Sequence, residues 1–178
     1  MLWLLLGVVI AVLLAMVVIA IVANKKKTEY RKMYTAAGNI LREDYLNYAL
    51  QNHAVNDSLK QPQGRKKMIC LKTNRNKKKI SFVFDPEKSI YIGRDADASN
   101  VFIDNVSVSL KNCRIYAENN QIMLEDLYST NGTVVRRGSF KRYMLRDGYR
   151  IALHSGDVIC VGNSELKLLI FDYNIAVM

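Results

Sequence analysis

The chain lacks the residue patterns that usually build a catalytic or metal centre. Its two histidines, His53 and His154, lie too far apart in the sequence to suggest a pair of metal ligands. Its cysteines, Cys70, Cys113 and Cys160, are odd in number and have no short spacing, which argues against a disulfide framework or a zinc site. Each cysteine lies in or beside an apolar run, so we expect buried, reduced thiols. We expect no catalytic residue, no cofactor and no metal. A Ser–His–Asp triad through His154 is the weakest interpretation of the chain.

Charge and proline are both absent from residues 2–23. A helix of about 20 residues spans the hydrocarbon core of a bilayer, so this run is long enough for a transmembrane anchor, which we place at residues 1–24. A cleaved signal peptide is the alternative. However, no basic residue precedes the run, the run is too long, and Ile21 stands where a cleavage site has a small residue. We therefore expect an uncleaved anchor that contacts membrane lipid through residues 2–23.

Basic residues follow the apolar run immediately, at Lys25, Lys26, Lys27, Arg31 and Lys32. Basic flanks of a membrane span stay on the cytoplasmic side. The sequence therefore predicts a single-pass membrane protein with its N-terminus outside and the rest of the chain in the cytoplasm. The same residues suit a region where anionic lipid head groups attract positive charge.

The formal net charge of the whole chain is +10, with a pI near 9.6. Such an excess suggests a nucleic-acid binder as one alternative. The basic runs are nevertheless dispersed, at residues 25–27, 65–67 and 77–79. None of them carries the interleaved aromatic side chains of a platform for single strands. The sequence therefore argues against a nucleic-acid partner.

Residues 25–64 form the predicted connection between the anchor and the rest of the chain. From Thr28 to His53 apolar and aromatic residues recur at helical spacing, which predicts a juxtamembrane helix; Gly38 lies inside it and allows a break. This helix could pack on its own domain, which we favour, or on a second copy of the chain. Residues 56–64 are polar and rich in turn formers, and they predict a linker.

After Gly64 the pattern changes to short apolar runs separated by turn signals such as Asn131-Gly132 and Asp147-Gly148. Many short strands without a convincing helix predict an all-β sandwich or barrel. The candidate strands are Met68–Lys72, Ile80–Phe84, Ile90–Ile92, Val101–Ile103, Cys113–Tyr116, Gln121–Leu124, Thr133–Val135, Met144–Leu145, Arg150–Leu153, Val158–Val161 and Leu166–Phe171.

Three short motifs between these strands carry the chemistry: Gly93-Arg94, Ser109 and the run Ser129–Thr133. A guanidinium, hydroxyls and an amide that meet at loop tips could hold a phosphate ester and its backbone. Each charge-assisted hydrogen bond contributes on the order of 1.5–3 kcal/mol. Taken singly, each motif has a plainer interpretation. Arg94 could pair with Asp95 or Asp97, Ser109 could be an ordinary loop hydroxyl, and the last run could be a hairpin turn.

In this order and spacing the motifs resemble a forkhead-associated (FHA) domain, a family of eleven-stranded β-sandwiches that bind phosphothreonine peptides through loops at one end. The similarity runs through Tyr91–Arg94, Val108-Ser109, Leu127–Thr133, Leu145–Gly148 and Gly156–Ile159. It implies an all-β FHA-type sandwich over residues 65–172, preceded by the transmembrane and juxtamembrane helices and followed by a tail at 173–178.

The resemblance also implies roles for individual residues. Arg94 would grip the phosphate and Ser109 would donate to a phosphate oxygen. Thr130 would shape the pocket for the phosphate and the threonine methyl group, and Asn131 would hold the main chain of the peptide. Gly93 and Gly132 would permit tight turns.

The sequence departs from the family pattern at three places. Asn112 replaces the histidine that usually follows the binding serine by three residues and supports the loop. Leu110 replaces the polar residue that usually follows that serine directly. Arg136 and Arg137 interrupt the Val-Asn-Gly sequence that often follows the last Gly-Thr pair.

The sequence therefore predicts a membrane-anchored cytoplasmic module that binds phosphothreonine-containing proteins, downstream of a Ser/Thr kinase, and is not an enzyme. The alternative is a scaffold for a membrane complex that works without phosphorylation. Leu110 and Asn112 favour that alternative.

Overall fold

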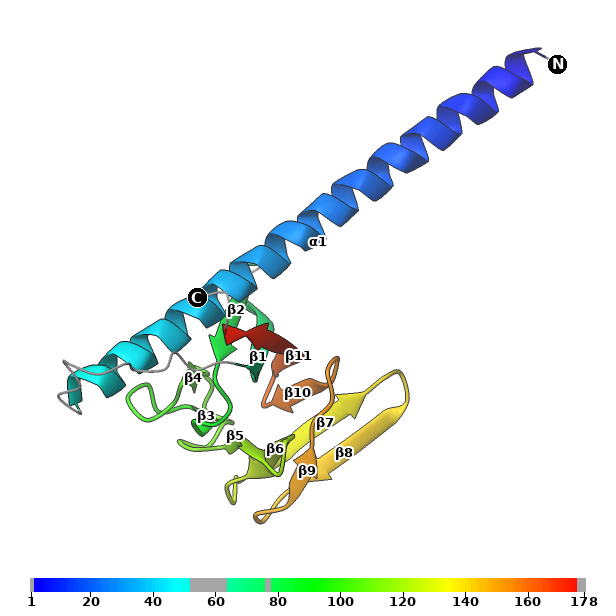
Figure 1. The fold of residues 1–178 in the computed structure, drawn as a ribbon. Helices are drawn as coiled ribbons and strands as arrows, with labels where there is room; N and C mark the ends of the chain where they lie inside the picture. Colours follow the sequence, from blue (N-terminus) through cyan, green and yellow to red (C-terminus); the bar gives the residue numbers. More distant parts are fainter. Residues whose placement is uncertain (1, 52–63, 76–77, 176–178) are drawn as a thin grey trace. The chain divides into compact units, whose positions relative to one another are not determined.

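The computed structural model describes residues 2–51, 64–75 and 78–175 (Figure 1). The chain forms two compact units, residues 1–36 and 37–178. His53 and most of the predicted linker at 56–64 lie outside the described residues. The elements in chain order are α1 (Leu2–Gln51), β1 (Arg65–Arg75), β2 (Lys78–Phe84), β3 (Ile90–Gly93), β4 (Val101–Phe102), β5 (Cys113–Glu118), β6 (Gln121–Asp126), β7 (Thr133–Arg137), β8 (Lys141–Leu145), β9 (Arg150–Ala152), β10 (Val158–Val161) and β11 (Ser164–Asn174).

The first unit is the N-terminal part of α1. Among the described residues, α1 is the one helix whose length and composition would allow it to cross a membrane, and its most apolar stretch has a mean hydropathy of 3.3. Apolar residues along the run, Val8, Leu14 and Ile19 among them, are exposed. The helix is therefore a candidate membrane anchor.

The break allowed near Gly38 is absent, because α1 continues without interruption from Leu2 to Gln51. The predicted anchor and juxtamembrane helix are consequently one helix. Gly38 has a packing reason instead: a Cβ at this position would lie 2.6 Å from the hydroxyl of Tyr173. Around this point Ala37 and Leu41 pack against Met68 and Tyr173 within the second unit.

The second unit contains a β-sandwich of eleven strands in two sheets, as predicted (Figure 1). Sheet A has the strand order β2-β1-β11-β10-β7-β8, and sheet B has the order β4-β3-β5-β6-β9. Every strand predicted from the sequence overlaps one of these. The largest difference is in β1 and β11, which pair from Arg65↔Asn174 to Lys72↔Lys167. This pairing carries β11 past residue 172, the end expected for the sandwich.

The core lies between the inward faces of the two sheets. Ile69 and Leu168 from sheet A meet Ile115 and Leu124 from sheet B, and all four are fully buried. Burying one such side chain contributes about 1.5–3 kcal/mol. Successive side chains along a strand point to opposite faces of the sheet, so every second residue enters the core and the residues between them face outward.

Several loops emerge at one end of the sandwich because of the strand directions. The parallel pair β3–β4 and the antiparallel pairs β3–β5 and β5–β6 bring Gly93, Cys113 and Asp126 to the same end. The β3–β4, β4–β5 and β6–β7 loops therefore share one rim. These loops hold all four predicted ligand-binding residues.

Candidate functional site

Gly93 ties the first two loops of the rim together. The backbone N–H of Arg94 donates to Ser109 O at 3.0 Å, and that of Asp95 donates to Leu110 O at 3.2 Å. A Cβ on Gly93 would lie 2.0 Å from Leu110 O, which no side chain could accommodate without moving the backbone. Glycine is therefore required here for the close approach of two loops.

Ser109 and Thr130 meet directly across the rim. The backbone N–H of Thr130 donates to Ser109 Oγ at 3.1 Å, and the two hydroxyl oxygens are 3.4 Å apart. Ser109 is half-buried and Thr130 is exposed. Two hydroxyls 21 residues apart in the sequence thus form one small polar surface, which each could offer to a ligand as donor or acceptor.

Arg94 lies beside this pair. Its Nε–H donates to Val108 O at 3.1 Å, the carbonyl immediately before Ser109. The remaining four N–H donors of a guanidinium belong to its two terminal nitrogens, and the residue is exposed. The ion pairs among the described residues do not include one between Arg94 and Asp95 or Asp97. Asp95 instead accepts from the backbone N–H groups of Asp97 and Ala98.

Asn131 links the β6–β7 loop to the β4–β5 loop. Its Nδ2 donates to Ser107 O at 2.8 Å, and the residue is exposed. Gly132 follows with φ of +76°, and a Cβ there would lie 2.8 Å from Leu145 O. The left-handed backbone and the close approach both favour glycine at this turn. Asn131 is thereby held within the same rim as Arg94, Ser109 and Thr130.

A buried polar network supports the rim from below. Asn112 Oδ1 accepts from the backbone N–H of Ser109 at 3.3 Å, and its Nδ2 donates to Thr133 Oγ1 at 2.9 Å. Thr133 donates onward to Asp126 Oδ1 at 2.8 Å, and Ser129 Oγ donates to the same oxygen at 2.6 Å. All of these groups except Ser109 are buried. Asn112 therefore makes the kind of bridge that the family's histidine was expected to supply.

Sequence reasoning did not single out Asp126, Thr133 or Ser129 as support for the site. Asp126 Oδ2 accepts from the backbone N–H of Ser129, three residues later. An aspartate at the end of a strand with a serine three positions on is a local turn signal. That signal could have identified Asp126, but nothing local indicates that Thr133 and Asn112 would meet it.

The third departure from the family pattern also has a structural explanation. Arg137 forms a two-pronged ion pair with Asp157, with Nε to Oδ1 at 2.9 Å and Nη2 to Oδ2 at 2.8 Å. The backbone N–H of His154 donates to the same carboxylate at 2.8 Å. Burial alone would raise the pKa of Asp157, but the bonds from Arg137 and His154 outweigh it and lower the pKa. Asp157 is thus a structural turn residue.

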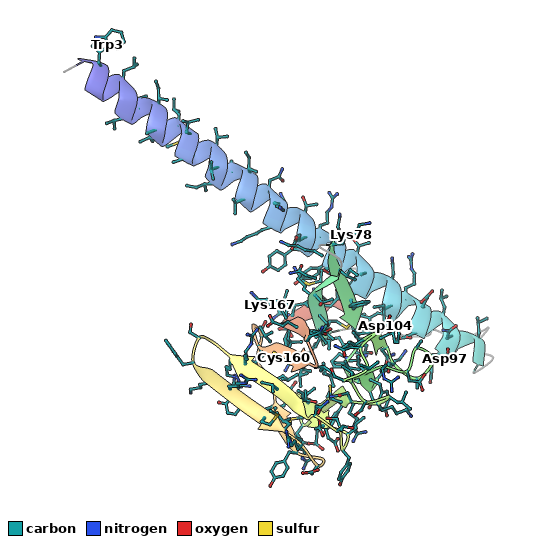
Figure 2. The ribbon with its side chains drawn as sticks, turned by 180° about the vertical axis from the view of Figure 1, so that it is seen from behind. Trp3, Lys78, Asp97, Asp104, Cys160 and Lys167 are labelled. Carbon is teal, nitrogen blue, oxygen red and sulfur yellow. The ribbon has the colours of Figure 1, made fainter. Side chains whose placement is uncertain are left out.

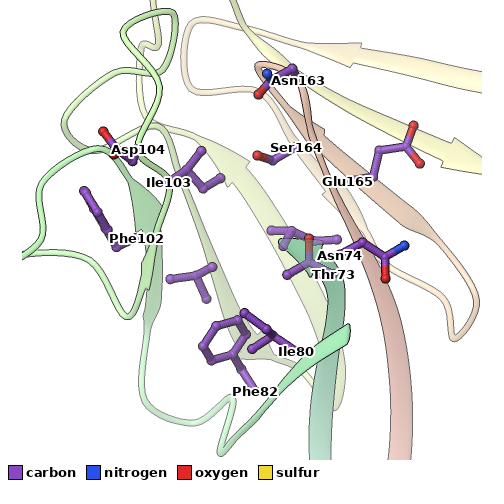
Figure 3. Close-up of a pocket in the computed structure, with 12 residues that line it drawn as sticks. Thr73, Asn74, Ile80, Phe82, Phe102, Ile103, Asp104, Asn163, Ser164 and Glu165 are labelled. Atoms are coloured by element: carbon purple, nitrogen blue, oxygen red, sulfur yellow. The ribbon is translucent and has the colours of Figure 1, made fainter. Parts of the chain in front are cut away.

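A cavity lies next to β2 and β4, the edge strands of the two sheets (Figure 3). That cavity has a volume of about 570 Å³ and is lined by residues from β1, β2, β4 and β11 and from the β4–β5 and β10–β11 connections, including Phe82, Asp104 and Asn163. None of the four predicted ligand-binding residues lines it. In the described part of the chain no group of three His, Cys, Asp or Glu side chains could hold a metal ion. The four predicted residues offer hydroxyl and amide groups and the positive charge of Arg94.

Residues 90–162, which lie within the sandwich, match the family model of the FHA domain. No curated protein matches the chain. Among solved structures, it is similar to the FHA domain of the CT664 protein from Chlamydia trachomatis, with 21% identity over 57% of this chain and 96% of that one and a TM-score of 0.48.

Two further solved domains are similar. The FHA domain of a hypothetical protein from Arabidopsis thaliana has 21% identity over 61% of this chain and 87% of that one, with a TM-score of 0.49. The MEK1 FHA domain in complex with a phosphothreonine peptide of HOP1 has 19% identity over 57% of this chain and 95% of that one, with a TM-score of 0.46.

Proposed function

We propose that the rim binds phosphothreonine in a peptide segment of a partner protein. The observation that carries the proposal is the direct contact between Ser109 and Thr130 beside the loop that Arg94 holds. Arg94 is the cation that would pair with the phosphate, and the two hydroxyls would bind its oxygens. Asn131, at the same rim, would hold the peptide main chain.

Hydrogen bonds already connect the three loops of the rim to one another. Little ordering of these loops would therefore be needed when a peptide binds. Three or four charge-assisted bonds, less the cost of ordering a peptide, correspond to roughly micromolar affinity, near −8 kcal/mol. Phosphate loses its second charge below about pH 6, so binding should weaken there. Such an affinity gains from confinement of both partners at one membrane.

The candidate membrane anchor supplies that confinement in our proposal. Residues 1–24 would anchor the chain, residues 25–64 would connect it to the sandwich, and the basic residues 25–27 would keep the sandwich in the cytoplasm. A Ser/Thr kinase would phosphorylate the partner, and the rim would recruit it to the membrane. The chain would act as a binding module and carry out no reaction itself.

The test is a titration of phosphorylated and unmodified threonine peptides against the full chain in detergent micelles, followed by fluorescence anisotropy. Arg94→Ala should weaken phosphopeptide binding by at least tenfold, since it removes charge-assisted bonds worth about 1.5–3 kcal/mol. The affinity of Arg94→Lys should lie between those of the parent chain and Arg94→Ala, because lysine keeps the charge and lacks the planar guanidinium group. Arg150→Ala, at an exposed arginine on β9, is the matched control. Parent-like binding by Arg94→Ala would show that the site is misassigned.

A phosphorylation-independent scaffold is the second candidate. Leu110 favours it, because this apolar side chain directly follows Ser109 and is 56% exposed on the rim. A scaffold would bind its partner through such apolar contacts, so phosphatase treatment would not weaken the complex. In that case Leu110→Ser would reduce binding and Arg94→Ala would not.

A further inference from the structure

A row of basic side chains crosses the outer face of sheet A. Strand pairing places six residues side by side, one from each strand: Ser81, Lys72, Lys167, Val158, Arg136 and Arg142. Four of the six are basic. They share the face opposite the core, because their neighbours Leu71, Leu168, Ile159 and Val135 are fully or almost fully buried. Figure 2 labels Lys167 on β11. We call these four residues the basic row.

The basic row places like charges directly opposite one another. Lys72 pairs with Lys167 across β1 and β11, and Arg136 pairs with Arg142 across β7 and β8. Like charges in such positions destabilise a sheet, so the row opposes the stability of the fold. In the next row Glu165 contacts Arg136 at 2.7 Å, which offsets part of the charge. Positive charge still dominates this part of the face.

Part of the same face, at β1 and β11, is covered within the second unit. Met68 and Tyr173 point outward from β1 and β11, and Ala37 and Leu41 of α1 pack over them. Cys70, the next outward residue of β1, is fully buried. Lys167 and Arg142 are exposed, and Lys72 and Arg136 are half-buried. The outer face thus has an apolar half that the helix covers and a basic half that remains accessible.

An exposed aromatic side chain lies close to the end of the basic row. Phe140, in the turn between β7 and β8, is 97% exposed. It immediately precedes Lys141 and Arg142. An aromatic side chain next to basic ones is a combination that membrane-surface segments use, with the ring in the interface and the charges at the head groups.

We propose that the basic row binds the anionic head groups of a phospholipid bilayer. From β1 to β8 the basic row spans four interstrand spacings of about 4.8 Å, a width of roughly 19 Å on the sheet face, which matches an extended surface better than a narrow ligand. The inference rests on the proposed membrane anchor, which would tether this face near lipid. It concerns a different surface from the phosphopeptide rim, and the four residues of that rim take no part in it.

The test uses the full chain in lipid nanodiscs made of phosphatidylcholine alone or with about one third phosphatidylserine. Amine acetylation is measured by mass spectrometry at Lys72 and Lys167 of the row and at Lys79, which is exposed two residues before Ser81 on the same face of β2. Lys111 is an internal reference away from sheet A. Each basic side chain near an anionic surface strengthens attraction about fivefold. Acetylation of these three lysines should therefore fall severalfold in the anionic discs. It should recover in 1 M salt, where the screening length shortens to about 3 Å.

Charge reversal supplies the second measurement. Lys167→Glu with Arg142→Glu should abolish the protection of Lys72 and Lys79. Lys67→Glu with Arg150→Glu changes the net charge equally at positions outside the row, and protection should persist. Even if the first double variant fails to fold, equal acetylation of the parent chain in the two lipids overturns the proposal. Protection by a soluble polyglutamate peptide or by DNA, without protection by lipid, also overturns it and assigns the row to that partner.

The same samples distinguish this proposal from the others. A chain that is removed from the nanodiscs by alkaline carbonate refutes the membrane anchor, and with it the tethering on which the lipid contact depends. Phosphopeptide affinity, measured in the anionic discs, should be the same for the parent and for Lys167→Glu with Arg142→Glu. Loss of lipid protection with unchanged peptide binding would separate the two surfaces.

Discussion

Asn112 offers the sharpest test of how the buried network supports the rim. Its side chain joins the backbone N–H of Ser109, at 3.3 Å, to Thr133 Oγ1, at 2.9 Å, and it is 2% exposed. Asn112→Ala removes both bonds. The backbone bonds of residue 112 to Ile92 and Leu127 can remain, so the variant should retain the strand pairing.

The expected loss of stability follows from the two bonds. A hydrogen bond contributes about 0.5–1.5 kcal/mol, and a buried polar group left without a partner costs about 1–3 kcal/mol. Thr133 still donates to Asp126, which limits the cost of leaving the Thr133 hydroxyl without Asn112. We therefore expect Asn112→Ala to lower the free energy of unfolding by about 2 kcal/mol, or Tm by roughly 8 °C for a domain of this size. Phosphopeptide binding should weaken as well, because Ser109 loses its support.

Urea unfolding followed by circular dichroism measures the first effect, and the anisotropy titration measures the second. Asn100→Ala is the matched control, since Asn100 is exposed and accepts one backbone hydrogen bond from Tyr91. Asn112→His introduces the residue that the family usually has and should keep more peptide affinity than alanine does. A change below about 0.5 kcal/mol for Asn112→Ala would mean that the network does not stabilise the loop.

Two further predictions concern titratable groups in the sandwich. Because the pKa of Asp157 is lowered in the folded chain, its carboxylate stabilises the fold above its ordinary pKa of about 4 and loses this effect as the pH falls through the lowered value. Asp157→Asn should therefore reduce Tm at pH 7 and flatten its decline between pH 5 and pH 3; an unchanged decline would contradict the role of the Arg137 pair. Burial raises the pKa of Cys113 to about 12, so iodoacetamide at pH 8 should modify half-buried Cys160 well before Cys113 in the folded chain. Equal rates without denaturant would refute this order.

Much of the sandwich could be predicted from the sequence because its strands are marked by local features. Period-two alternation and turn residues such as Asn131-Gly132 identified every strand, including β4, which has only two residues. The ends of β1 and β11 were harder to place. Both strands extend through polar residues such as Lys66 and Asp172, whose strand conformation comes from their pairing partners.

Local sequence was also insufficient to predict the length of α1. Glycine weakens a helix by about 1 kcal/mol relative to alanine, so a break at Gly38 was a reasonable expectation. Tyr173, 135 positions later, packs against Gly38, and a side chain at position 38 would clash with its hydroxyl. Helix propensity is a property of the local sequence, whereas the contact with Tyr173 joins residues far apart in the chain.

Residue identity by itself determined that an apolar N-terminal run precedes a β-rich domain, and that Arg94, Ser109, Thr130 and Asn131 recur in an order that resembles one family. Order along the chain says nothing about distance in space. Only the pairing of β3, β5 and β6 placed these loops at one rim, and only the register of sheet A aligned Lys72, Lys167, Arg136 and Arg142. Both surfaces arise from strand pairing between distant segments, which no local pattern encodes.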